Sequence, residues 1–156
     1  MTLNNMSIVF MYFYFLSLFP GQGDEPGVRS FRIDDKDVMV TFKADTKFYG
    51  KYSGSHGGYL LLNEDGTGEY LADYYGYALP SCQPGPVTFI WGFLIDQHNS
   101  IVKLKRDYGL SYPIIYESTG KTSFQGCRKK FLVDYLMVRP DGSIGVSSSD
   151  DWEKIH

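Results

Sequence analysis

Short runs of β-forming residues alternate with turn residues along most of the chain, and no long segment has the 3.6-residue period of an amphipathic helix. In residues 38–43, Val and Phe alternate with more polar positions, which is typical of a half-buried strand. The pattern therefore predicts an all-β fold, an antiparallel up-and-down meander of eight to ten strands that forms a barrel or a closed sandwich. The strands are predicted at residues 38–43, 48–52, 59–63, 67–72, 87–95, 101–106, 112–117, 121–125, 131–139 and 143–147.

Turn residues separate these runs. Asp65-Gly66 and Asp141-Gly142 are the strongest hairpin signals, because glycine accepts the positive φ that tight hairpin turns require. The segments 96–99 and 118–120 are also predicted turns. The second of these is expected to join the strand at 112–117 directly to a partner at 121–125.

Two predicted strands are apolar on both faces, namely residues 89–95 and, with one exception, residues 131–138. A small barrel fills its interior from only one face of each strand, so the other face must be covered. The cover could come from residues 28–44, from a terminal helix near Trp152, or from a partner protein. We expect the chain itself to supply it.

The N-terminal part of the chain has the order of an export signal. Residues 8–19 are uncharged and mostly apolar, and the breaker Pro20 and the small-x-small tripeptide 21–23 follow them. The run is too short to cross a bilayer, which takes about 20 residues. We therefore predict a signal peptide at residues 1–23, a single domain at residues 24–156, a secreted or periplasmic location, and no stable membrane span after leader removal. The alternative is an N-terminal strand or helix buried in the domain.

Cys82 and Cys127 are the two cysteines of the chain. In an exported protein they are expected to form one disulfide, which in the chain-entropy model contributes roughly 4 kcal/mol to stability. The alternative is a nucleophilic cysteine with a histidine base. No motif near either residue supports that chemistry, so we predict that the protein is not an enzyme.

Charge and motif content exclude several other classes of function. With 15 basic and 18 acidic residues the formal charge is −3, which argues against a nucleic-acid partner. The three histidines have no metal-ligand spacing, and the segment ending in Gly120-Lys121-Thr122 lacks the first glycine of a phosphate-binding loop. We expect no metal and no cofactor.

Two segments resemble those of a known family. Gly50-Lys51-Tyr52 resembles the Gly-x-Trp start of lipocalin-type (calycin) barrels, with Tyr52 where a lipocalin has Trp. The run from Leu61 to Tyr70, followed by Phe89-Ile90-Trp91, looks like bacterial extracytoplasmic lipocalin-like domains. The resemblance covers roughly residues 48–148. It implies an up-and-down barrel with an apolar pocket, and no catalytic residues.

These observations lead to two expectations about function. The first is an exported β-barrel binding protein that holds an apolar or aromatic small molecule in its interior, with an aromatic loop at one mouth. The second is an exported protein-binding module of inhibitor or immunity type, with a filled core and the loop at residues 73–86 as its interface. The expected ligand-binding residues are Trp91, Phe89, Phe93, Tyr116, Tyr74, Tyr75 and Tyr77.

Overall fold

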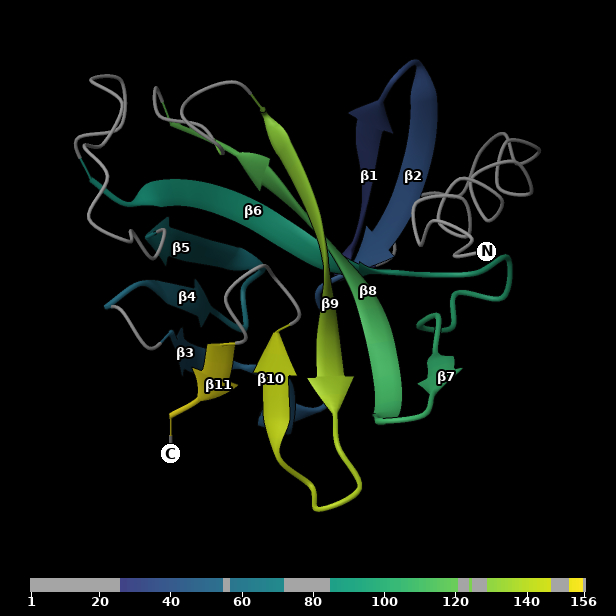
Figure 1. The fold of residues 1–156 in the computed structure, drawn as a ribbon. Helices are drawn as coiled ribbons and strands as arrows, with labels where there is room; N and C mark the ends of the chain where they lie inside the picture. The colour runs from purple at the N-terminus through teal and green to yellow at the C-terminus, as the bar shows by residue number, and fades with distance from the viewer. Residues whose placement is uncertain are drawn as a thin grey trace, which may run out of the picture.

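The computed structural model describes residues 26–54, 57–71, 85–120, 124, 129–146 and 152–155 (Figure 1). Several sequence-based predictions lie outside these residues and stay predictions. They are the signal peptide at 1–23, the loop tyrosines Tyr74, Tyr75 and Tyr77, and the cysteines Cys82 and Cys127.

The described residues form eleven strands and one short 3-10 helix, η1. In chain order these are β1 (Val28–Ile33), β2 (Lys36–Thr41), η1 (Thr46–Phe48), β3 (Gly50–Ser53), β4 (Tyr59–Leu62), β5 (Thr67–Leu71), β6 (Val87–Leu94), β7 (Leu104–Arg106), β8 (Gly109–Ser118), β9 (Phe131–Val138), β10 (Ile144–Val146) and β11 (Trp152–Lys154).

Eight of the strands close into an antiparallel barrel. The strands β3, β4, β5, β6, β8, β9, β10 and β11 follow one another around it, and each pairs with the next. The barrel closes where β11 pairs with β3, with Glu153 opposite Ser53 and Lys154 opposite Tyr52. Closure leaves none of the eight strands with an open edge along its whole length. The predicted all-β up-and-down meander is therefore confirmed.

The β1–β2 hairpin lies outside the barrel and covers one of its faces (Figure 1). Its strand β2 pairs with the end of β6, with Val40 opposite Leu94. Phe31 and Val38 from the hairpin join Leu94 of β6 and Ile115 of β8 in a second hydrophobic core. The chain itself therefore covers the outer face of β6, as expected, and its N-terminal segment supplies the cover. On β9, Phe131 packs against this core while Val133 is exposed.

One predicted connection is wrong, and one of the alternatives left open for the cover is excluded. Residues 121–125 were expected to pair with the strand at 112–117, but β8 pairs with β9 over eight residue pairs, from Leu110–Val138 to Glu117–Phe131. That long ladder satisfies more backbone groups than a short local hairpin could. A terminal helix near Trp152 was also considered. Residues 152–154 instead form β11, which pairs with β10 on one side and with β3 on the other and so closes the barrel.

The two Asp-Gly turns are confirmed and share one hydrogen-bonding pattern. Gly66 has a φ of +78° and Gly142 a φ of +85°, values that L side chains rarely adopt. In each turn the aspartate carboxylate accepts the backbone N–H two residues further on, from Thr67 to Asp65 at 2.9 Å in the first turn. The local chemistry of these turns sets the register of the β4–β5 and β9–β10 hairpins.

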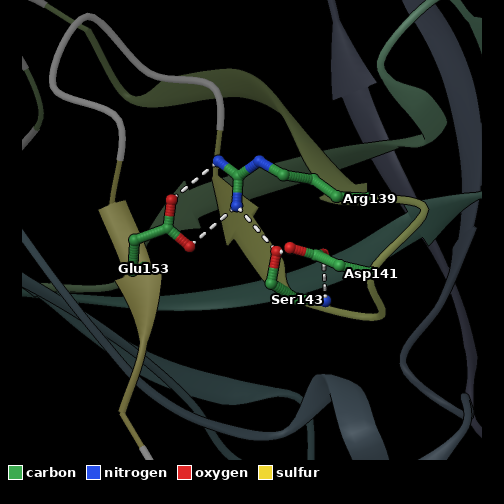
Figure 2. Close-up of polar contacts among 4 residues, drawn as sticks. All are labelled: Arg139, Asp141, Ser143 and Glu153. Carbon is green, nitrogen blue, oxygen red and sulfur yellow. Dashed lines mark hydrogen bonds and ion pairs between the residues drawn. The ribbon is translucent and has the colours of Figure 1, made fainter.

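An ion pair connects β11, the strand that closes the barrel, to the residue that follows β9. Figure 2 shows Arg139, at the end of β9, reaching Glu153 on β11. Two guanidinium nitrogens lie 2.8 and 2.7 Å from the two carboxylate oxygens, and one also donates to the Ser143 hydroxyl at 3.3 Å. Asp141 in turn accepts the Ser143 hydroxyl at 2.7 Å. β11 is only three residues long and therefore makes few backbone hydrogen bonds. The bidentate ion pair adds to these bonds.

Replacing Arg139 with Met should therefore destabilise the protein slightly, by about 1 kcal/mol, since the pair is partly exposed to solvent. Urea unfolding at low and high salt measures the change. Arg32→Met is the matched control, because its ion pair with Asp37 is well exposed and lies outside the barrel. An Arg139→Met effect no larger than that of Arg32→Met would show that the ion pair does not help to close the barrel.

Candidate ligand site inside the barrel

The aromatic side chains of β6 share one face of the strand, as its two-residue period predicts. Phe89, Trp91 and Phe93 all lie in the core cluster of the barrel interior and are at most 1 % exposed. Trp91 is held in place by its indole N–H, which donates to the Thr67 carbonyl at 2.9 Å. Because side chains alternate along a strand, Ile90 points to the outer face and packs against the second core.

The four described residues of the expected binding site come together in this interior. The rings of Phe89 and Tyr116 are 5.0 Å apart, and those of Trp91 and Phe93 are 5.5 Å apart. Their placement inside the barrel agrees with the sequence analysis. The same contacts would also stabilise a filled core.

One end of the barrel is closed by η1. Asp45 caps this short helix by accepting the Lys47 N–H at 3.1 Å. Its Phe48 ring lies 5.3 Å from Phe93 and 5.1 Å from Tyr112, and its carbonyl accepts the Tyr52 hydroxyl at 2.7 Å. This end is therefore packed and hydrogen-bonded by barrel strands and η1 together.

The other end contains Phe124, which comes from the connection between β8 and β9. Its ring lies 5.6 Å from Tyr70, 6.0 Å from Phe89 and 6.2 Å from Tyr116. The Phe124 backbone N–H donates to the Lys129 carbonyl at 2.9 Å, and the Lys129 N–H donates to the Phe124 carbonyl at 3.1 Å. Phe124 thus occupies the space that the rings of three barrel strands enclose. Sequence analysis placed it in a strand and missed this role.

Asp134 is an acid on the inner face of β9. Its side chain is 6 % exposed. It lies on the same face of the strand as Leu132 and Leu136, which pack in the barrel interior. Its carboxylate accepts the Tyr135 N–H at 2.8 Å, and in the described part of the chain it makes no ion pair. Burial raises the pKa of Asp134 from 3.8 to about 8. Asp134 is not among the site residues predicted from the sequence, although a lone acid in an otherwise apolar strand is a usable signal.

The Tyr116 hydroxyl is buried on the neighbouring strand and has no hydrogen-bond partner among the described residues. Burial raises the pKa of this phenol well above its ordinary value, and the charges of Asp134, Tyr52 and Tyr70 raise it further. Asp134 is paired with Ile114, one inward position from Tyr116. It is therefore the diagonal neighbour of Tyr116, and such neighbours have a typical separation of about 7–8 Å.

Among the described residues, the inner face around Asp134 and Tyr116 carries an acid but no basic side chain. Lys154 shares the inner face, opposite Tyr52, and its ammonium donates to the Lys47 carbonyl beside η1. It thus belongs to the η1 end. The other described inward positions of the eight strands carry no basic side chain. Asp134 and Tyr116 therefore form a small polar site in an apolar and aromatic interior.

Comparisons with protein-family models, with curated proteins and with solved structures found no match. The fold is accordingly described as an eight-stranded antiparallel barrel, which is consistent with a lipocalin-like barrel. Within the described residues, no helix has the length and apolar character that crossing a membrane requires. No group of three His, Cys, Asp or Glu side chains in the same residues is placed to hold a metal ion.

Proposed function

We propose that this chain is an exported, lipocalin-like binding protein that holds a small apolar or aromatic molecule inside its barrel, hydrogen-bonded to Tyr116. The observation that supports this best is the buried Tyr116 hydroxyl, which has no hydrogen-bond partner among the described residues. A buried polar group without a hydrogen bond costs about 1–3 kcal/mol. A ligand that supplies the missing bond would remove that cost in the bound state, whereas a purely structural tyrosine could be replaced by phenylalanine to advantage.

Phe124 indicates where the ligand would lie. An eight-stranded barrel is wide enough to be filled by side chains or to hold one small ligand. Tyr70, Phe89 and Tyr116 belong to barrel strands, but Phe124 belongs to a connection. In our proposal the apolar part of the ligand takes the place of the Phe124 ring between these three residues. The polar part then reaches the Tyr116 hydroxyl and Asp134.

The Tyr116→Phe variant tests this proposal. We expect the wild-type protein to bind 1-aminoanthracene saturably, with enhanced fluorescence, and Tyr116→Phe to bind it about tenfold more weakly because one hydrogen bond is lost. The same variant should melt at a higher temperature than the wild type without probe, since it no longer buries an unpaired hydroxyl. Tyr108→Phe is the control, because Tyr108 is 51 % exposed outside the core.

A wild-type protein that binds no probe would contradict the proposal, and so would a Tyr116→Phe variant that binds it as tightly as the wild type. The two readouts separate the roles of Tyr116. Higher stability combined with weaker binding indicates a residue kept for its ligand. Higher stability with no binding in either protein indicates a packing residue.

The second candidate is a protein-binding module with a filled barrel. It is supported by the ring contacts of 5.0–6.2 Å among Phe89, Tyr116 and Phe124, which leave the interior occupied by the protein's own side chains. Its proposed interface, the loop at residues 73–86, lies almost wholly outside the described residues. The absence of probe binding in the experiment above would favour this candidate.

A further inference from the structure

We propose that the ligand is a small aromatic or aliphatic amine, bound as its ammonium ion between the Asp134 carboxylate and the rings around Tyr116. This inference rests on the proposed function and adds the charge of the ligand. It starts from a side chain for which the barrel itself offers no counter-ion: Asp134 is buried, lies on the inner face of β9 and makes no ion pair in the described part of the chain.

A buried carboxylate without a partner is unfavourable, and a protein that needed only a packed core would have an apolar residue at this position. Asp134 lies between two inward leucines, and its inner-face neighbour across the ladder is Ile114. The inward-facing Lys154 is bound to a carbonyl at the η1 end of the barrel. A ligand ammonium would provide the positive charge that the described interior lacks around Asp134.

The surrounding groups match the donors of an ammonium ion. A protonated amine offers only N–H donors, while the ionised Asp134 carboxylate and the Tyr116 oxygen can both accept them. Phe89 and Tyr116, with ring centroids 5.0 Å apart, present aromatic rings on the same wall. Aromatic faces attract cations by their quadrupole, most strongly where water is excluded. An anionic ligand would find no cation on the described inner face near Asp134, and its charge would oppose ionisation of that carboxyl.

Binding of an amine should also be linked to pH through Asp134. The titratable groups on the inner face around it are phenols: Tyr112 and Tyr116 on β8, with Tyr52 and Tyr70 on the strands beyond. The described part of β10, its other neighbour, contributes none. Because the pKa of Asp134 is raised to about 8 by burial, its carboxyl is protonated near neutral pH. The ammonium displaces that proton to the buffer.

The test compares three ligands of one shape by isothermal titration calorimetry on the full chain: 2-phenylethylamine, 2-phenylethanol and phenylacetate. We expect the amine to bind about tenfold or more tightly than the alcohol, and phenylacetate not to bind measurably. Asp134→Asn should abolish the preference for the amine, so that the amine and the alcohol bind this variant with similar affinity. Asp37→Asn, at an exposed position on β2, should keep the preference.

A second readout needs only the wild-type protein. Near pH 6.5, titrations in two buffers of different ionisation enthalpy should show the release of about one proton per amine bound. As pH increases toward the pKa of Asp134, the amine affinity should increase about tenfold per pH unit. Equal affinity for amine and alcohol, or binding without proton release, would overturn the amine assignment while the proposed function stands. If none of the three ligands and no 1-aminoanthracene binds, the proposed function fails as well.

Discussion

Asp134→Asn should make the protein more stable at alkaline pH and should remove most of the pH dependence of its stability between about pH 4 and pH 8. Burial raises the pKa of Asp134 from 3.8 in an ordinary environment to about 8 in the folded protein. Between these two values the folded state binds a proton that the unfolded state has lost. The free energy of unfolding therefore falls as pH rises, by about 1.4 kcal/mol per pH unit, and levels off above the folded pKa.

Urea unfolding of the wild type and Asp134→Asn across this pH range measures the effect. The two proteins should differ little near pH 4 and by several kcal/mol near pH 8, because asparagine does not titrate. Asp37→Asn should retain the wild-type slope, since Asp37 lies exposed outside the barrel. Parallel profiles for the wild type and Asp134→Asn would show that this carboxyl is not buried as described.

The acids of the turns act in a different pH window. Asp65 accepts hydrogen bonds from the Thr67 hydroxyl and backbone N–H, and Asp96 and Asp141 accept them from nearby backbone N–H groups. These bonds lower the three pKa values. A group with a lowered pKa adds stability that is present above its unfolded pKa and is lost as pH falls through its folded pKa. Their contribution therefore changes below about pH 4, where it does not overlap with that of Asp134.

Trp91→Ala should cause the largest loss of stability among single substitutions of the expected site residues, about 3–5 kcal/mol. The side chain is fully buried and packs edge-on against Phe93, with ring centroids 5.5 Å apart. Truncation leaves a cavity and removes the indole N–H from the Thr67 carbonyl. We expect the variant to remain folded but weakened, and to lose affinity for 1-aminoanthracene.

Thermal and urea unfolding measure this loss, and Trp91→Phe is the matched variant. It keeps an aromatic ring against Phe93 but cannot donate to Thr67, so its loss of stability should be clearly smaller. If Trp91→Ala costs less than about 1 kcal/mol, the ring cannot occupy the buried position that the barrel gives it. If its probe affinity is unchanged, Trp91 does not belong to the binding site.

The barrel could be predicted from the sequence because its strands carry their own local signals. The two-residue period of β6 puts Phe89, Trp91 and Phe93 on one face, and Asp-Gly turns define two hairpins. Nine of the ten predicted strands have counterparts in the described fold, and the tenth, at residues 121–125, lies mostly outside the described residues. The unpredicted strands β1 and β11 have weak local patterns: β1 buries fully only Phe31, and β11 is three residues long.

The candidate site was harder to predict, for physical reasons that differ between residues. Phe89, Trp91, Phe93 and Tyr116 follow from strand alternation. Phe124 does not, because its position depends on the long-range pairing of β8 with β9 rather than on any local preference. Asp134 was hidden because β9 is apolar on both faces, so that no simple alternation shows which way its single acid points.

The most direct test of the account is an NMR titration of the Asp134 side-chain carboxyl, with 13C-labelled aspartate assigned by comparison with Asp134→Asn. In the free protein its midpoint should lie near 8, and saturating 2-phenylethylamine should lower it. That result would place a buried acid and a cationic ligand in the same barrel. A midpoint in the ordinary range for aspartate, unchanged by the amine, would contradict both the buried site and the ligand that we propose for it.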